Sequence, residues 1–226
     1  MLFKEVAPSI VKLVLVQENL VTEGTGFVVR NQSSGELVIV TANHVAKCNE
    51  TSQALSQHAF FNSSDYFPSA RKQAFLNPPS NTKFRVSVLS FSVQDDYCFL
   101  RLPDGAPFIP PLEPSLEVSR GKVCSRTTCF CNSKKATNLP LQQVFVVGFP
   151  GFGSALTLSE GLISQVDPHQ HRFRILSDGV TTTQGGPGGP LLRKDRSFVG
   201  VVLAVDQTTG NFVEVLPYWK LMPFLV

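Results

Sequence analysis

Three segments of the 226-residue chain hold residue types that could carry chemistry. His44 lies in TANHV, residues 41–45, where we expect a hydrophobic strand to end and a short helix to begin. Asp96 stands directly before the apolar residues 97–102, and a carboxylate at the entrance to such a strand needs polar partners. Residues 185–192 read GGPGGPLL, a glycine-rich loop. Since an imidazole exchanges protons near neutral pH, His44 is the first candidate for a chemical role.

Each segment also has a purely structural interpretation. A lone histidine is more often an ordinary surface or core residue than a functional one. Asp95 and Asp96 together could cap the turn before a strand. Glycine-rich loops are common. Any chemistry therefore depends on elements that bring the three segments together.

The rest of the sequence predicts short strands separated by turns. The expected strands are residues 9–16, 24–29, 37–41, 84–91, 97–102, 144–149, 161–166, 172–176, 198–205 and 212–216. Helical patterns are confined to residues 46–55 and 218–225. Many short strands with few helices indicate an all-β barrel or sandwich. We predict two β units, 1–102 and 115–226, joined by a proline-rich linker at 103–114.

Composition limits the class of protein. With 42% hydrophobic and 16% charged residues, the chain is too apolar for disorder and long enough to bury a sizeable core. No apolar run reaches the ~18 residues that a membrane helix needs. The N-terminal stretch lacks the order of a signal peptide, which favours a cytoplasmic or other intracellular location. The net charge of +3 is scattered along the chain, so we expect no nucleic-acid partner.

The five cysteines are predicted to be reduced thiols, because no secretory signal is evident. Three of them, Cys124, Cys129 and Cys131, cluster in a short polar stretch. Their spacing fits no usual zinc site and no fourth ligand is nearby, so we predict free thiols in a loop, with no metal and no cofactor. That loop belongs to one of two expected insertions, residues 47–83 and 120–143.

The order of these motifs resembles that of the trypsin-like serine proteases, and of their HtrA-type branch in particular. Beside TANHV and the Asp96 segment, the matching stretches are VAPSIV at 6–11, GTGFVV at 24–29, VVGFPG at 146–151, GLIS at 161–164 and GGPGGPL at 185–191. The resemblance implies two six-stranded antiparallel β-barrels of the chymotrypsin fold, followed by a short C-terminal helix. It also implies that His44 corresponds to the family's general base and Asp96 to the residue that orients its ring.

One position departs from the family pattern. The family reads Gly-Asn-Ser-Gly-Gly-Pro-Leu where this chain reads Gly-Gly-Pro-Gly-Gly-Pro-Leu, which places Pro187 at the nucleophile position. Proline has neither a hydroxyl nor a backbone N–H. The family's oxyanion hole uses N–H groups that correspond to Gly185 and Pro187, so only Gly185 could still donate. Gly186 and Gly188 complete this oxyanion loop.

These observations predict a catalytically inactive protease homologue in which His44 and Asp96 are vestigial. A protein of this shape could still hold an extended peptide between its barrels. By resemblance, the residues in contact with the peptide would be Thr182, Thr183, Gln184, Val202, Leu203 and Ala204. Two alternatives stay open. The first is an active endopeptidase with a non-standard nucleophile. The second is an architectural subunit that packs against a partner protein or against a second copy of itself.

Overall fold

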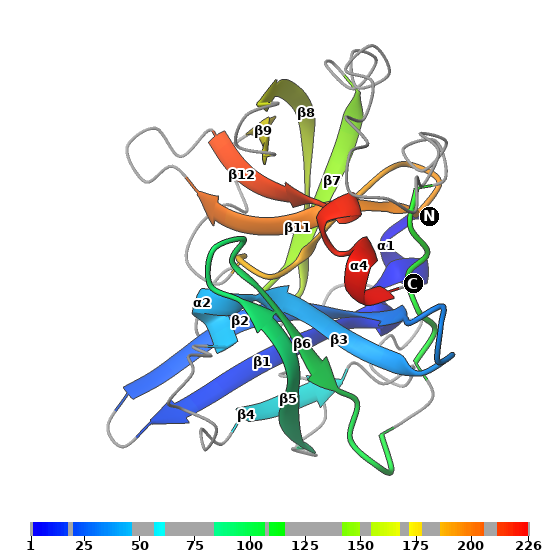
Figure 1. Ribbon diagram of the computed structural model, residues 1–226. Coiled ribbons are helices and arrows are strands. Elements are labelled where there is room, and N and C mark those ends of the chain that lie inside the picture. Colours follow the sequence, from blue (N-terminus) through cyan, green and yellow to red (C-terminus); the bar gives the residue numbers. More distant parts are fainter. Residues whose placement is uncertain are drawn as a thin grey trace, which may run out of the picture.

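The structure, a computed structural model, describes residues 2–17, 20–46, 57–61, 84–106, 109–115, 142–149, 155–167, 172–177, 186–205 and 212–225. Its strands form two closed six-stranded β-barrels, ordered β1-β2-β3-β6-β5-β4 and β10-β11-β12-β9-β8-β7 (Figure 1). Neighbouring strands within each barrel are antiparallel. The fold class predicted from the sequence is therefore confirmed.

The first barrel follows a short helix and a 3-10 turn, α1 (Leu2–Val6) and η1 (Ala7–Ser9). Its elements are β1 (Ile10–Gln17), β2 (Leu20–Arg30), β3 (Leu37–Ala42), α2 (Asn43–Ala46), β4 (Gln57–Phe61), β5 (Phe84–Ser92) and β6 (Tyr97–Arg101). The second barrel contains β7 (Gln143–Gly148), β8 (Thr157–Asp167), β9 (Arg172–Ser177), β10 (Pro190–Leu192), β11 (Phe198–Val205) and β12 (Phe212–Pro217). Two short helices, η4 (Tyr218–Lys220) and α4 (Met222–Leu225), end the described chain.

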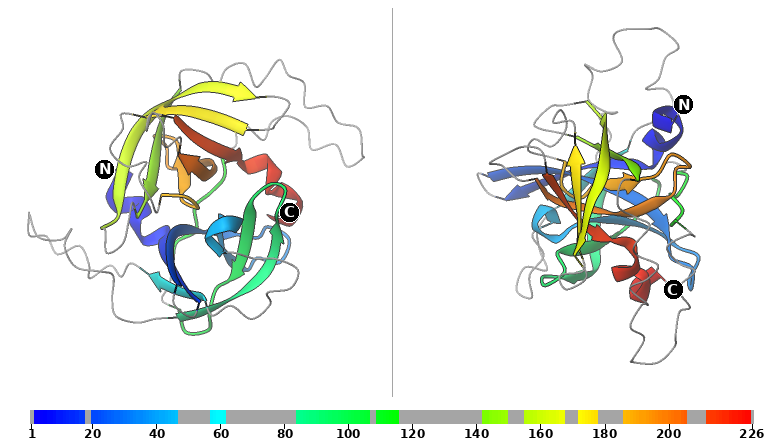
Figure 2. Two further views of the ribbon diagram at one scale, coloured as in Figure 1. Left: turned by 90° about the vertical axis from the view of Figure 1, so that its left-hand side faces the viewer. Right: turned by 90° about the horizontal axis from the view of Figure 1, so that it is seen from above.

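The two barrels share an apolar core at their interface. Figure 2 shows the blue-to-green strands of the first barrel on one side and the yellow-to-red strands of the second on the other. Phe27 of β2 and Phe198 of β11 are both fully buried, and their ring centroids lie 5.4 Å apart. A separate cluster, which includes Ile163, Ile175 and Val213, fills the interior of the second barrel. Burial of the larger cluster across both barrels fixes how the two are placed.

Each end of the described chain packs on the opposite barrel. Glu5 of α1 forms an ion pair of 2.6 Å with Arg196, in the turn between β10 and β11. At the other end, Gln32 N donates to the carbonyl oxygen of Leu225 at 2.6 Å. The ring of Phe224 lies 5.3 Å from that of Tyr97 on β6. The first and last residues of the described chain thus brace the interface between the barrels.

Several elements differ from the sequence-based expectation. Strand β4 lies inside a segment that we expected to be an insertion, and β10 lies inside the glycine-rich motif. The N-terminal residues 6–11 do not form one strand: Pro8 lies in η1 and β1 begins at Ile10, because proline cannot donate to a strand ladder. The predicted helix at 46–55 falls mostly outside the described residues, and α2 precedes it.

The segment between the barrels follows both of them closely. Leu112 N donates to the carbonyl oxygen of Val28 at 2.8 Å, and Ser115 N donates to that of Phe198 at 3.0 Å. The division at 103–114 stays a prediction. Among the described residues, no helix is long and apolar enough to span a membrane.

Candidate active-site region

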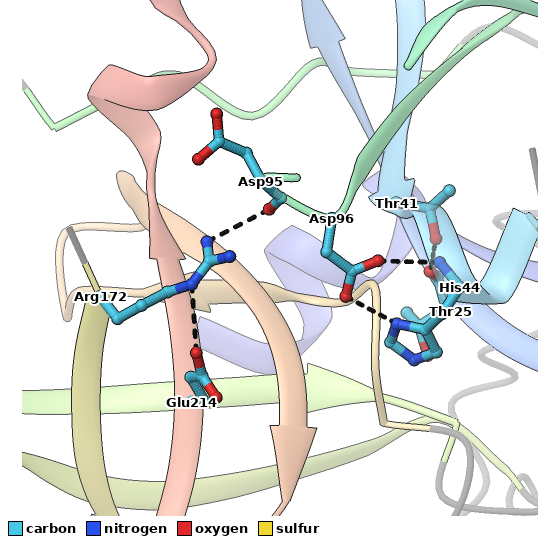
Figure 3. A network of polar contacts seen from close by, with 7 residues as sticks. All are labelled: Thr25, Thr41, His44, Asp95, Asp96, Arg172 and Glu214. Carbon is cyan, nitrogen blue, oxygen red and sulfur yellow. Dashed lines mark hydrogen bonds and ion pairs between the residues drawn. The ribbon is translucent and has the colours of Figure 1, made fainter. Parts of the chain in front are cut away.

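The pairing of β3 with β6 brings His44 beside Asp96. Ala42, the last residue of β3, pairs with Tyr97, the first residue of β6. His44 follows on α2 and Asp96 ends the turn before β6, so both lie at the same edge of the first barrel. The Nδ1 atom of His44 lies 2.8 Å from Oδ2 of Asp96, and the backbone N of His44 donates to Oδ1 at 2.9 Å (Figure 3).

The backbone of Asp96 has an unusual conformation. Its φ of 59° lies in the left-handed region, which aspartate adopts more readily than most residues but still at a cost. Asn43 N donates to the Asp96 carbonyl oxygen at 3.1 Å and helps to hold it. The side chains of His44 and Asp96 are 49% and 28% exposed, so solvent weakens the electrostatic part of their contact.

The residues around Pro187 form a turn that is tied to β11. Gly189 N donates to the Gly186 carbonyl oxygen at 3.2 Å and closes the turn. Gly188 N donates to the Val202 carbonyl oxygen at 2.7 Å, and Val202 N donates to that of Gly189 at 2.8 Å. These backbone hydrogen bonds hold the turn that contains Pro187.

This turn packs directly against β2 and β3 of the first barrel. The carbonyl oxygen of Pro187 accepts a hydrogen bond of 3.1 Å from Thr25 N. Gly188 has a φ of +87°, and a Cβ there would stand 2.1 Å from the Thr25 carbonyl oxygen and 2.3 Å from Thr41 Oγ1. The glycine at 188 is therefore required by packing, whatever the chemistry of the site.

Thr25 joins the two halves of the site. Its carbonyl oxygen accepts a hydrogen bond of 2.7 Å from Thr41 Oγ1, on the strand that leads to His44. Its own Oγ1 accepts a bond of 2.9 Å from Phe149 N, just after β7. With the bond to Pro187, this one buried residue connects β3, β7 and the turn at 186–189.

The arrangement holds the His44 imidazole against the Asp96 carboxylate. Within the described ranges, Asp96 is the only residue hydrogen-bonded to the His44 imidazole. Pro187, which the sequence pattern predicts at the nucleophile position, offers a carbonyl oxygen that already accepts a hydrogen bond from Thr25 N. Gly185 lies outside the described residues, as do Cys124, Cys129 and Cys131. No group of metal-binding side chains occurs in the described part of the chain.

The predicted peptide-binding residues are only partly accessible. Thr182, Thr183 and Gln184 fall outside the described residues. Val202 is 1% exposed in the core of the second barrel, and Leu203 is 3% exposed in the interface core. A register shift between Val202 and Ala204 marks a β-bulge, which turns Leu203 inward. Of these three side chains only that of Ala204 is exposed, so an apolar lining by Val202 and Leu203 is not open to a ligand.

Sequence reasoning missed a polar network beside the His44–Asp96 pair. Arg172 of β9 donates from Nη1 to the Asp95 carbonyl oxygen at 3.2 Å, and its Nε lies 3.1 Å from Glu214 Oε1 (Figure 3). Lys220 Nζ lies 3.4 Å from Asp95 Oδ1. Arg172 is 77 positions away from Asp95, and no local pattern could have linked them.

Comparisons with known proteins agree with the two-barrel fold. The family model of the trypsin-like peptidase domain matches residues 24–201. Among solved structures, the active form of the Rv3671c protease from M. tuberculosis has 20% sequence identity and a TM-score of 0.65, with 99% of this chain and 82% of that chain covered. The Deg5 structure has 18% identity and a TM-score of 0.63, with coverage of 98% and 89%.

A serine endoprotease from Yersinia pestis is also similar, with 15% identity, a TM-score of 0.64 and coverage of 98% of this chain and 63% of that one. A search of the curated proteins gave no match. At these identities, the solved structures show a common fold, which is that of the HtrA/Deg proteases. Because the family model covers well over half of the sequence, this chain belongs to the trypsin-like peptidase domain family.

Proposed function

We propose that this protein is a catalytically inactive member of its family that binds an extended peptide between its barrels. The observation that carries the first part is Pro187. It stands at the nucleophile position, in a turn that is otherwise kept in place by Gly186, Gly188 and Gly189. A proline supplies neither an attacking oxygen nor the second oxyanion donor.

The size of the expected loss supports this proposal. Removal of the nucleophile from a working triad costs about 10⁶-fold in rate, which corresponds to about 8 kcal/mol in activation free energy. Removal of one oxyanion donor costs about 3–4 kcal/mol in an intact enzyme. The two effects do not add, but either one would reduce turnover to a negligible level.

The presence of His44 and Asp96 can be explained without a catalytic role. Asp96 accepts a backbone hydrogen bond from His44 as well as the contact from its ring. Removal of one partner from such a pair leaves the other without its hydrogen bond. The pair therefore has a structural reason to persist.

The edge of β11 supports peptide binding. Pairing of β10 with β11 ends at Val201, and the 188–189 turn takes up both backbone groups of Val202. Beyond this point the described pairing of β11 is with β12 alone, through Ala204 and Val205. A strand edge that is unpaired among the described residues can accept an extended peptide as an additional strand.

Covalent probes separate the proposal from an active hydrolase with another nucleophile. The folded protein would be treated with a fluorophosphonate and, separately, with iodoacetamide, and labelled sites would be mapped by mass spectrometry. We expect no fluorophosphonate labelling, and iodoacetamide labelling that is the same in wild type and His44→Ala. Labelling of a serine or cysteine that disappears in His44→Ala would overturn the proposal.

A pair of variants tests the binding site. Ala204→Glu places a charge on the exposed edge of β11, and Ser87→Glu places the same charge on the exposed face of β5 in the other barrel. Peptides selected from a displayed library on wild type should lose affinity for Ala204→Glu and keep it for Ser87→Glu. If the peptides bind equally well to both variants, their binding site does not lie at this edge of β11. Light scattering after size-exclusion would then test the architectural alternative of a self-associating subunit.

A further inference from the structure

The left-handed backbone of Asp96 needs support from its surroundings. Non-glycine residues in this region are strained and persist only when neighbouring structure holds them. The φ angle of Asp96 is the rotation about its N–Cα bond, measured against the preceding peptide plane. That plane contains the carbonyl group of Asp95. A group that binds the Asp95 carbonyl oxygen therefore acts directly on the conformation that aims the Asp96 carboxylate.

Arg172 is the group that binds this carbonyl oxygen. Its Nη1 donates to Asp95 O at 3.2 Å, and its Nε is held 3.1 Å from Glu214 Oε1 on the neighbouring strand β12. Only 13% of the Arg172 side chain is exposed. The planar guanidinium group can make both contacts at once, because its donors point in fixed directions.

Two further contacts hold the residues next to Asp96. Lys220 Nζ of η4 lies 3.4 Å from Oδ1 of Asp95. The ring of Tyr97 packs against that of Phe224 of α4, with their centroids 5.3 Å apart. All three contacts come from elements that follow the first barrel in the chain, so the turn is held by the second barrel and the C-terminal helices. Within the first barrel, Asp95 N donates to Ser92 Oγ at 3.0 Å.

We propose that Arg172 is a positioning residue: through the Asp95 carbonyl group it holds Asp96 in the left-handed conformation that aims its carboxylate at His44. The orientation of the imidazole then depends on the packing of one barrel on the other. This inference does not depend on peptide binding or on the loss of activity, because it concerns only contacts that the folded chain makes with itself.

The test is an NMR measurement on the His44 ring in protein with ¹⁵N-labelled histidine, at alkaline pH where an ordinary imidazole is neutral. Its signals are assigned by their absence from His44→Gln. In wild type we expect the proton to reside on Nδ1, facing Asp96. In Arg172→Ala we expect a mixture of tautomers and exchange of the Nδ1 proton with water that is at least about tenfold faster, because a charged hydrogen bond in the chain of contacts is lost.

Arg174→Ala is the matched control. Arg174 lies on the same strand and pairs in register with Glu214, but it is exposed, and among the described residues it forms no hydrogen bond or ion pair with the Asp95–Asp96 turn. We expect this variant to leave both the tautomer and the exchange rate unchanged. Arg172→Lys keeps the positive charge but loses the planar guanidinium group that makes both contacts at once. It should give an intermediate exchange rate.

If Arg172→Ala does not fold, Glu214→Gln serves instead, because it weakens the ion pair with Arg172 Nε. It should change the His44 ring signals in the same direction by a smaller amount. The proposal is overturned if folded Arg172→Ala retains the wild-type tautomer and exchange rate. It is equally overturned if Arg174→Ala changes them to the same extent, because a general loss of stability would then explain the effect.

Discussion

The end of β3 and the turn at 186–189 meet across the barrel interface, yet they are held in place by different kinds of contact. At the end of β3, His44 and Asp96 make the contacts that hold an imidazole in place. In the turn, the glycines and backbone hydrogen bonds determine the conformation around Pro187, which we propose replaces the nucleophile. One region is held by contacts of polar side chains, and the other by backbone packing.

The difference shows that the Gly-Gly-Pro-Leu motif reports packing as much as catalysis. Gly188 is needed because the backbone of Thr25 and the hydroxyl of Thr41 leave no room for a Cβ. Gly189 likewise approaches the carbonyl oxygen of Val147, which would stand 2.3 Å from an added Cβ. Such constraints act on the fold whether or not position 187 can react. The following changes test each side of this comparison.

The largest effect is expected from Gly188→Ala. The new methyl group would overlap the Thr25 carbonyl oxygen, in a backbone region that L-residues rarely adopt. We expect a loss of about 3 kcal/mol or more in the free energy of unfolding. Gly35→Ala is the control, since Gly35 has a similar φ of +73° with open space around it. Urea denaturation that shows equal losses for the two variants would reject the packing argument.

Thr25→Val tests the junction between the two regions. Valine keeps the shape of threonine but removes the oxygen that accepts from the buried N–H of Phe149. An unsatisfied buried donor costs about 1–3 kcal/mol, which denaturant titration would detect. Thr22→Val, on the same strand but less buried, should cost far less. A neutral Thr25→Val would mean that Phe149 N does not depend on this bond.

Asp96→Asn tests whether the pair is structural only. Asparagine tolerates the left-handed backbone and can still accept from His44 N, so only the charged contact to the ring is lost. Because the pair is partly exposed and screened, we expect a loss of roughly 0.5–1 kcal/mol in stability. Peptide affinity should not change. A change in peptide hydrolysis would instead assign the pair a catalytic role.

The smallest effect concerns Tyr97, which follows Asp96. Burial raises the pKa of the Tyr97 hydroxyl, and the negative charge of Asp95 raises it further. Since the folded state keeps this proton longer, stability should fall as pH rises above the ordinary value of 10.0. Asp95→Asn should lower the pKa of Tyr97 slightly and reduce that fall.

Tyr97→Phe provides the reference for this last measurement. Without the hydroxyl, the contribution of residue 97 to the loss of stability at alkaline pH should vanish, while the packing of its ring against Phe224 is retained. Stability curves measured by denaturation at a series of alkaline pH values would compare the three proteins. Identical curves for wild type and Tyr97→Phe would show that another group causes the loss.

Much of the fold could be predicted from sequence because short apolar, β-branched runs mark most of the strands. The stretches around Leu37 and Phe198 are strongly β-branched, and each is a strand in the structure. Strand β10 was missed because it has only three residues and begins at Pro190, inside a motif dominated by glycine. Strand β4 was missed because polar and proline-rich residues surround it.

The site could be predicted only where a local motif marked it. His44 and Asp96 stand in recognisable segments, and the structure places them in contact. The inward turn of Leu203 could not be foreseen, because it follows from a bulge in the pairing with β12. The contact of Arg172 with Asp95 arises from the packing of two barrels, and such long-range pairing leaves no periodic trace in the sequence.

The most direct test of the central claim is the fate of a bound peptide. Wild type and His44→Ala would each be incubated with the same peptide library, and the bound and free peptides would be identified by mass spectrometry. The account predicts that both proteins retain the same intact peptides and that neither produces fragments. Fragments that wild type produces and His44→Ala does not would contradict it, because they would show that the site still cleaves despite Pro187.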